Sequence, residues 1–381
     1  MVRIFVGIRI PPEYHIGLIV FLTGKTAEKS LEKTHACTAH SEKSRKSSKF
    51  AGMETFRSTF PIEKAPFGLS HDNRILLLGS CFTENMGARL AALKFYASIN
   101  PFGIVYNPLS ISRCLERLLD GDQPFSAAEL AQHAGLWHGW EHHGSLSDPD
   151  QGRLIERLNT LYFGAVDFLR GADRLIVTPG TADVFFLQAE GRPVANCHKA
   201  PAAIFRERRL GVEETVSALQ AVFERLHRRL PDLRIILSVS PIRHLRKGPV
   251  ANQRSKAALL LACAELCERL PYVQYFPAYE LLLDDLRDYR FYERDLTHPS
   301  GLAQDYIWEK FTETYFSPAT LQLADRLRQL RAAVEHRPFR PDSAEHRQFA
   351  RKQLELIASL EMTAPALDFS IEKAHFQQII G

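Results

Sequence analysis

Cysteine is scarce in this chain of 381 residues, and its few thiols form no recognisable framework. The six cysteines make no C-x-x-C pair and no zinc-type spacing, which argues against both a structural zinc site and a dense disulfide scaffold. We therefore expect reduced thiols and a cytoplasmic protein. The alternative is export, with the apolar run Ile16–Leu22, preceded by Arg3 and Arg9, as the core of a signal peptide.

Long apolar runs and charge of one sign are also missing. No segment approaches the ~20 apolar residues that a membrane-spanning helix needs, so we expect no membrane span. The net charge is only +4, and basic residues are mixed with acidic ones along the chain. This pattern lacks the basic surface of a nucleic-acid-binding protein, so we expect no nucleic-acid partner.

Composition divides the chain into three parts. Residues 25–49 are rich in Lys, Ser and Thr, which predicts a poorly ordered and dispensable N-terminal extension over residues 1–52. A functional domain is expected over residues 53–316, starting at Met53. Residues 317–381 contain two charged, helix-prone stretches, Leu321 to Glu335 and Glu345 to Glu361, and are expected to form a C-terminal helical extension.

Short apolar runs alternate with amphipathic stretches in the central part. The runs are strand-like, and apolar residues between them recur at three- and four-residue spacing, as in helices. Continuous apolar strands separated by helices are typical of a mostly parallel sheet covered on both faces, which predicts an α/β fold. The expected strands are Ile75–Leu78, Leu175–Thr178, Ile235–Val239 and Val273–Phe276; the helical patterns are Ile111/Leu115/Leu118, Leu154/Leu158/Leu161 and Val216/Leu219/Phe223/Leu226.

The first strand is followed by Gly79, Ser80 and Cys81, and the sequence Asp295-Leu-Thr-His298-Pro lies far downstream. Together they offer a nucleophile, a histidine base and an acid that orients it, which is the equipment of acyl transfer. A thiol at a helix N-terminus is expected to have a lowered pKa. The alternative is structural: Cys81 as a small buried residue, Ser80 as a helix cap, and Asp295 and His298 as parts of a surface turn.

Six short motifs extend this pattern along residues 53–316. They are Gly79-Ser80-Cys81-Phe82-Thr83, Asn100-Pro101-Phe102-Gly103, Tyr106-Asn107-Pro108, Thr178-Pro179-Gly180-Thr181-Ala182, Ser240-Pro241-Ile242-Arg243-His244 and Asp295-Leu296-Thr297-His298-Pro299-Ser300. Together they resemble the GSCFA family, which is grouped with the SGNH (GDSL-type) hydrolases. The resemblance implies a three-layer α/β/α, flavodoxin-like fold and hydrolysis or transfer at ester bonds.

The SGNH pattern, carried over by this resemblance, places the nucleophile at Cys81, with Ser80 as the alternative. It places the base and its orienting acid at His298 and Asp295, and the oxyanion glycine at Gly103. The Gly-x-Asn motif of the superfamily falls on Gly180, Thr181 and Ala182, so its asparagine donor is missing. Losing such a donor costs ~10²–10³ in rate, unless Asn100, Asn107 or Thr181 replaces it.

The sequence thus predicts a hydrolase or acyltransferase acting on a small-molecule or carbohydrate ester or thioester, without metal or organic cofactor. Arg243 and His244, directly after the third strand, are expected to bind substrate. The alternative is a structural role, pairing with Asp284, Asp285 or Asp288. The cluster around His138 and His142 suggests a metal site only if it is helical; a loop lining the substrate site is preferred. The rival function is a non-catalytic binding protein for a glycan or acyl ligand, favoured by Ala182.

Overall fold

A parallel sheet forms the centre of the structure. This computed structural model describes residues 58–381, so the predicted N-terminal extension and the start at Met53 lie outside the described residues. The strand order is β10-β9-β5-β1-β2, and every neighbouring pair is parallel. The predicted α/β class with a mostly parallel sheet is confirmed. The five strands are β1 (Arg74–Gly79), β2 (Tyr96–Ile99), β5 (Arg174–Thr178), β9 (Arg234–Leu237) and β10 (Val273–Tyr275).

The strands lie where the apolar runs predicted them, except at their ends and at one edge. β9 ends at Leu237, two residues before the expected end, and β10 ends one residue early, at Tyr275. The sequence did not reveal β2. Its residues are only half-buried or exposed, and Tyr96 is 54% exposed, because this edge strand pairs on one side only.

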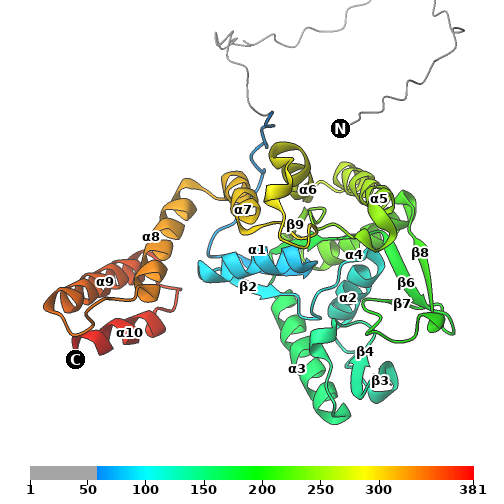
Figure 1. Ribbon diagram of the computed structural model, residues 1–381, viewed down its shortest axis with the longest axis horizontal. Helices are drawn as coiled ribbons and strands as arrows, with labels where there is room; N and C mark the ends of the chain where they lie inside the picture. Colours follow the sequence, from blue (N-terminus) through cyan, green and yellow to red (C-terminus); the bar gives the residue numbers. More distant parts are fainter. Residues whose placement is uncertain (1–57) are drawn as a thin grey trace, which may run out of the picture. The chain divides into compact units, whose positions relative to one another are not determined.

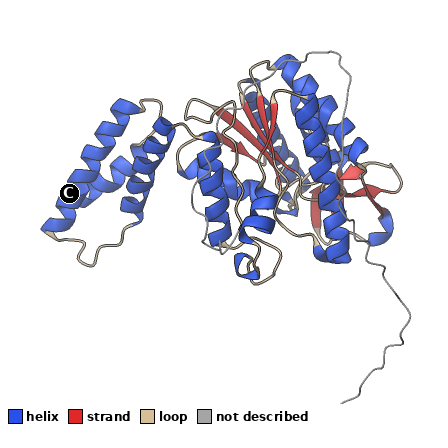
Figure 2. Ribbon diagram, turned by 90° about the horizontal axis from the view of Figure 1, so that it is seen from above, coloured by secondary structure: helices blue, strands red, loops and turns tan. Residues whose placement is uncertain are grey.

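Side chains of each strand enter two different cores, because successive residues of a strand point to opposite faces. Leu76 and Leu78 of β1 pack in one core with side chains of α2, α3, α4 and α5, whereas Ile75 and Leu77 pack in the other with those of α1 and α7. The sheet is therefore the middle of three layers (Figures 1 and 2). The helices are α1 (Cys81–Ala92), α2 (Pro108–Asp120), α3 (Gln151–Arg170), α4 (Val212–Arg229), α5 (Gly248–Arg269) and α7 (Gly301–Tyr315), with the single turn α6 (Ala278–Glu280) before a π-helical turn.

The amphipathic patterns predicted their helices correctly, but in one helix a residue expected on the buried face is exposed. The four apolar residues expected in α4 are fully buried, as are those expected in α2 apart from the 2% exposed Leu118. In α3, however, Leu161 is 38% exposed, and the buried position next to it belongs to Tyr162. The Tyr162 hydroxyl donates to Arg117 O at 3.1 Å, so this aromatic side chain satisfies its polar atom while filling the core.

Antiparallel strands form two small sheets in addition to the main parallel sheet. β3 (Leu130–His133) and β4 (Leu136–Gly139) form a hairpin, and β6 (Asp183–Leu187) lies between β7 (Pro193–Val194) and β8 (Phe205–Arg209). Side chains from both groups share a small apolar cluster, which joins the hairpin to the three-stranded sheet. Its members are Trp140, Leu187, Val194 and Phe205.

Three helices follow α7, and the two charged C-terminal stretches of the sequence predicted two of them. α8 (Pro318–Glu335) and α9 (Ala344–Thr363) match the two predicted stretches, and α10 (Ser370–Ile380) was not predicted. The three helices lie side by side (Figure 1). Their apolar side chains, such as Leu330, Leu360 and Phe376, belong to one buried cluster. Among the helices that the structure describes, none is long and apolar enough to cross a membrane.

Candidate active site

Three strands end side by side, and the turns after them carry the candidate residues. Gly79 at the end of β1 is in register with Thr178 of β5, and Val177 is in register with Leu237 of β9. Gly79 has φ +156°, and a Cβ atom there would lie 2.5 Å from Thr178 O. Only glycine fits this turn from strand to helix, which places Cys81 at the first position of α1.

Ser80 is held in a structural role at this turn. It is 2% exposed and caps α1, and its Oγ accepts a hydrogen bond from the Phe82 amide at 3.2 Å. The same hydroxyl donates to Ser240 Oγ at 3.0 Å. Cys81 is only half-buried. Of the two candidate nucleophiles, the geometry therefore favours Cys81.

The pKa of the Cys81 thiol is raised, which reverses the expectation from the sequence. Burial is the main cause, and the nearby Glu84 carboxylate acts in the same direction. The amides of Cys81 and Phe82 and the charge of Lys256 lower the pKa without offsetting this effect. Withdrawal from water penalises the thiolate more than the helix N-terminus favours it. Cys81 therefore needs a base or a counter-charge to act as a nucleophile.

Asp295 and His298 form a hydrogen-bonded pair. His298 Nδ1 lies 2.5 Å from Asp295 Oδ2, and Asp295 Oδ1 accepts hydrogen bonds from the amides of Thr297 and His298. The hydrogen bonds from these backbone amides and from the His298 ring hold the pKa of the Asp295 carboxyl at about 2. The ionised carboxylate therefore orients the imidazole and leaves Nε2 free of this contact. Both side chains are nearly half exposed.

Contacts on two sides hold this loop near the carboxyl edge of the sheet. The Arg243 amide, after β9, donates to Thr297 O at 3.1 Å, and its guanidinium donates to Leu296 O at 3.0 Å. On the other side, Asn85 of α1 donates to Gln304 of α7, whose amide donates in turn to Pro299 O. The histidine loop therefore lies between the turn after β9 and the helix that begins with Cys81.

The predicted oxyanion donors differ in availability. The Gly103 amide donates to Asn100 O at 2.7 Å, so its hydrogen is engaged within a tight turn. Asn100 Oδ1 accepts from the Gly79 amide at 2.9 Å, while Asn100 Nδ2 is buried and has no hydrogen-bond partner among the described residues. Asn100 is thus a donor fixed beside the end of β1.

The other substitutes for the missing asparagine are engaged elsewhere. Asn107 caps α2, and its side-chain amide donates to Ser110 Oγ and Val194 O. Thr181 Oγ lies 2.8 Å from Ser255 Oγ of α5, and the Gly180 amide donates to Tyr106 O at 2.7 Å. Asn100 is therefore the best placed of the three proposed replacements.

Arg243 and His244 occupy different surroundings. The Arg243 guanidinium holds Leu296 O and lies over the rings of Tyr289 and Tyr292, so it supports the histidine loop. The His244 ring lies 5.3 Å from that of Tyr106, and its buried Nε2 has no partner among the described residues. Burial, helped by the charge of Lys256, lowers the pKa of His244 to about 4. It is therefore neutral near pH 7.

A cavity of about 470 Å³ opens beside these residues. Tyr106, Thr181 and His244 form its side toward the strand ends, and the antiparallel strands β6 and β8 contribute Asp183, Phe185 and Glu207. A cavity with one apolar ring, hydroxyls and charged groups suits a small polar ligand. Its lining includes the predicted substrate-binding residues Asn107, Thr181 and His244, but not Cys81, Asp295 or His298.

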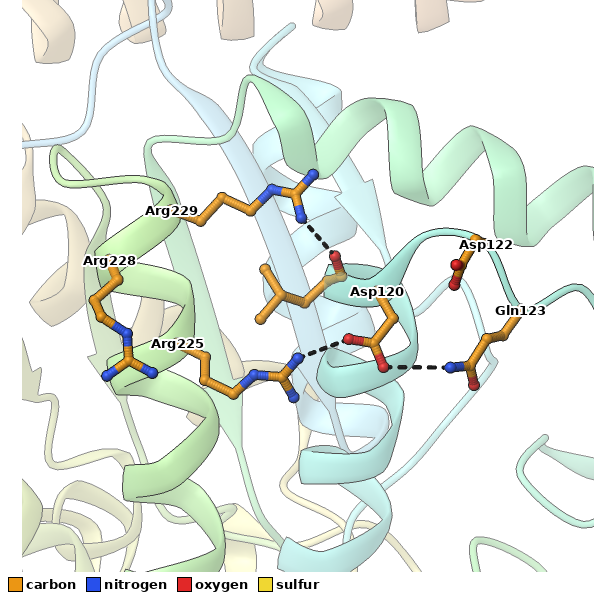
Figure 3. Close-up of a pocket in the computed structure, with 7 residues that line it drawn as sticks. Asp120, Asp122, Gln123, Arg225, Arg228 and Arg229 are labelled. Atoms are coloured by element: carbon orange, nitrogen blue, oxygen red, sulfur yellow. Dashed lines mark hydrogen bonds and ion pairs between the residues drawn. The ribbon is translucent and has the colours of Figure 1, made fainter.

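A larger cavity, of about 570 Å³, is lined by the residues drawn in Figure 3 and by none of the candidate catalytic residues. It is formed by the last residues of α2 and α4, and helices in this fold end at the amino edge of the sheet. Arg225 pairs with Asp120 at 2.6 Å, and Arg229 donates to Leu119 O at 3.0 Å. These contacts join two helix ends and involve none of the candidate catalytic residues.

The histidine cluster serves the packing of β4 and the turn after it. His138 lies in β4, so the segment is not the helix that a metal site would need. Its ring nitrogens lie 2.6 Å from Ser147 Oγ and 3.1 Å from His133 O, and His142 packs against Phe102 and Phe125. No group of three metal-ligating side chains occurs within residues 58–381.

Lys256, a fully buried residue of α5, was not predicted from the sequence. Its Nζ donates to Gly180 O at 2.5 Å and to Ser240 O at 2.6 Å. Burial lowers its pKa to about 7, against the opposing influence of Cys81. A signal existed: Lys256 falls at the helical spacing of the buried face of α5. That face consists of Asn252, Ser255, Lys256, Leu259, Ala262, Cys263 and Leu266.

Because two histidines are buried, we expect the protein to lose stability in acid. Burial lowers the pKa of His142 to about 3 and that of His198 to about 4, below the ordinary value of 6.5. Between pH 6.5 and 4 the unfolded chain therefore binds more protons, so stability is complete above pH 6.5 and falls on acidification. Each such histidine contributes up to about 1.4 kcal/mol per pH unit.

Urea unfolding at pH 7 and pH 5 measures this effect. In His142→Leu, the loss of unfolding free energy between the two pH values should be smaller than in the wild type by about 2 kcal/mol. His375→Leu, on α10 and remote from the buried histidines, is the control and should keep the wild-type loss. Equal losses in His142→Leu and the wild type would contradict the assignment.

Comparisons with known proteins agree with the extent of the motifs. The model of the GSCFA family matches residues 74–311, and that of the GSCFA domain protein, C-terminal domain, matches residues 327–380. No curated protein matches the chain. A solved structure from Streptococcus pneumonia, described as a "putative platelet activating factor", is 15% identical over 63% of this chain and 83% of that chain, with a TM-score of 0.33. A TM-score this low is not evidence of a shared fold or function.

Proposed function

This chain belongs to the GSCFA family, and on that premise we propose that it hydrolyses or transfers acyl groups at Cys81. The observation that carries the proposal is the Asp295–His298 pair, joined at 2.5 Å on a loop held against α1 and the turn after β9. An oriented imidazole, on a loop tied through Gln304 to the helix that begins with a half-buried thiol, supplies the base and the nucleophile that nucleophilic catalysis needs. The relation to SGNH hydrolases and their flavodoxin-like fold belongs to this proposal.

The reaction follows from these roles. His298 Nε2 takes the proton of the Cys81 thiol while the sulfur attacks the carbonyl carbon of an ester or thioester. The tetrahedral intermediate collapses, the leaving group departs with the proton from His298, and a thioester remains on Cys81. Water, or another acceptor, then attacks this thioester with His298 again as base, which releases the acyl group and restores the thiol.

Stabilisation of the oxyanion falls to groups at the end of β1. The Cys81 amide lies at the start of α1, and Asn100 Nδ2 is a buried donor without a partner in the described part of the chain. The cavity beside Tyr106 and His244 would hold the substrate, a small-molecule or carbohydrate ester. The five cysteines of the described residues are free, which supports a cytoplasmic location as part of the proposal.

Intact-protein mass after brief exposure to a p-nitrophenyl acyl ester tests the proposal. We expect one acyl adduct in the wild type, its absence in Cys81→Ala, and its slower formation in His298→Ala. Cys267→Ala, which removes another half-buried thiol, is the matched control and should keep the adduct. Loss in Ser80→Ala with a folded protein would move the nucleophile by one residue, and no adduct in the wild type would refute acyl transfer.

A binding protein on the same fold is the second candidate. It is favoured by Ala182 at the asparagine position and by the engagement of the Gly103 amide within its turn. In that case the cavity beside Tyr106 would hold a glycan or acyl ligand without turnover. The wild type would then show no adduct, and a ligand that binds would raise the midpoint of thermal unfolding without being consumed.

A further inference from the structure

Two cations share a single carboxylate on one wall of the cavity beside Tyr106. The cavity lining includes Arg246 and Lys247, from the turn before α5, and Glu207 of β8. Lys247 Nζ lies 2.8 Å from Glu207 Oε2, and the Arg246 guanidinium donates to Glu207 Oε1. Because one carboxylate neutralises only one of the two cations, a positive charge on this wall remains uncompensated.

The second carboxylate of the cavity does not supply the missing negative charge. Among the described residues that line the cavity, Asp183 and Glu207 are the only acids. Asp183 accepts two hydrogen bonds from the Arg209 guanidinium, at 3.1 and 3.0 Å, so this pair is neutral as a whole. The positive charge left by Arg246 and Lys247 is therefore available to a ligand.

The Arg246 side chain is held by its neighbours and still open to solvent. Its guanidinium lies over the Phe185 ring, 5.0 Å from the centroid, and the side chain is 63% exposed. The preceding backbone is fixed, because the His244 amide donates to Asn252 Oδ1 at 2.8 Å. A planar guanidinium stacked on a ring in this way can present N–H groups to two oxygens of a carboxylate or a phosphate.

The cavity is connected through the backbone to the turn that carries Cys81. The Val105 amide donates to Gly79 O at 3.0 Å, and the next residue, Tyr106, lines the cavity. Tyr106 O accepts a hydrogen bond from the Gly180 amide, in the turn after β5, at 2.7 Å. The segment that lines the cavity is thus bound to the turns that follow β1 and β5.

We propose that this cavity selects a ligand with an anionic group, a carboxylate or a phosphate monoester, which Arg246 and Lys247 bind while the rest of the ligand lies against Tyr106 and Phe185. The inference deepens the proposed function and rests on it only for the reaction, in which the ester that acylates Cys81 would carry this anionic group. Arg246 and Lys247 then determine specificity, since they recognise a group that takes no part in acyl transfer.

Isothermal titration calorimetry with three matched probes tests the proposal. The probes are glucuronate, which carries a carboxylate, glucose 6-phosphate, which carries a phosphate, and glucose, which carries neither. We expect at least one of the two anions to bind the wild type about tenfold more tightly than glucose, and their comparison distinguishes carboxylate from phosphate. Equal affinities for all three probes, or binding of none, would overturn the proposal.

Arg246→Gln and Glu207→Gln should change the affinity for the preferred anion in opposite directions. Arg246→Gln removes the excess charge but leaves Glu207 paired with Lys247, so the variant should fold and bind the anion about tenfold more weakly. Glu207→Gln removes the carboxylate that competes with the ligand for both cations, so it should bind the anion more tightly than the wild type.

Arg254→Gln is the matched control, because it removes the same charge from an exposed residue of α5 that does not line the cavity. It should bind the anion as tightly as the wild type does. An unchanged affinity in folded Arg246→Gln, or an equal loss in Arg254→Gln, contradicts a specific role of the cavity.

The two proposals fail in different ways. Anion binding that depends on Arg246, without any acyl adduct in the wild type, would refute acyl transfer and support the anion site. An acyl adduct on Cys81 from the p-nitrophenyl ester, without any preference for the anions over glucose, would refute the anion site alone.

Discussion

Replacing Asp295 by asparagine should reduce the rate of acylation at Cys81 by about 10³–10⁴-fold, by the logic of a histidine held in the wrong tautomer. The carboxylate at 2.5 Å from His298 Nδ1 keeps the proton on that nitrogen, so that Nε2 can act as a base. An asparagine that presents its NH₂ to the ring would instead favour the tautomer with the proton on Nε2. The rate of adduct formation from the p-nitrophenyl ester measures the effect.

Asp295→Asn tests the catalytic role of the carboxylate without changing the conformation of the loop. The amide oxygen of the substituted side chain would still accept the two backbone amides that the Asp295 carboxylate now holds, so Asp295→Asn should fold with an unchanged unfolding midpoint. Asp284→Asn, at an exposed ion pair with Arg287, is the control and should acylate at the wild-type rate. A loss of less than tenfold in Asp295→Asn would assign Asp295 to the loop alone.

Gly79→Ala should lower the free energy of unfolding by about 3 kcal/mol, because the new methyl group meets backbone that cannot withdraw. A Cβ atom at Gly79 would lie 2.5 Å from Thr178 O, 3.0 Å from Thr178 N and 2.4 Å from Thr83 Oγ. The residue also has φ +156°, a conformation that alanine rarely adopts. Relief of the clash requires β1 to separate from β5 or α1 to move.

Urea unfolding of Gly79→Ala and of a matched Gly→Ala variant checks this expectation. Gly164 lies in α3 with nothing within 4 Å of a new Cβ atom, so Gly164→Ala should raise stability by about 0.5–1 kcal/mol through helix propensity. The same chemical change thus has opposite signs at the two positions. A loss below about 1 kcal/mol at Gly79 would show that the strand-to-helix turn can relax.

Some features of the candidate site could be predicted from the sequence, and others could not. The pairing of Asp295 with His298 was predictable, because three residues on a tight loop bring the two side chains together. The raised pKa of Cys81 was not, because it depends on how deeply the rest of the fold buries the thiol. The choice between Ser80 and Cys81 likewise came from Ser240, which lies 160 residues from Ser80 in the chain.

The main strands, several helices and their order could be predicted from the sequence. Apolar runs at strand length identified β1, β5, β9 and β10, and amphipathic patterns between them identified α2, α3 and α4, because burial imposes these periodicities on neighbouring residues. The sequence also located the glycine turn at Gly79 and the motifs shared with the GSCFA family. The edge strand β2 was not predicted, because a strand that is only half-buried has a weak apolar pattern in its sequence.

Which polar groups are free and which are hydrogen-bonded depends on the tertiary structure and could not be predicted from the sequence. The Gly103 amide closes a turn, Asn107 caps a helix, and Asn100 keeps a buried donor beside β1. Lys256, unremarkable in the sequence, lies where β5 and β9 end, and its Nζ binds one backbone carbonyl in the turn after each strand. Partners of this kind are distant along the chain, and only packing brings them within hydrogen-bonding distance, so no local pattern of residues encodes them.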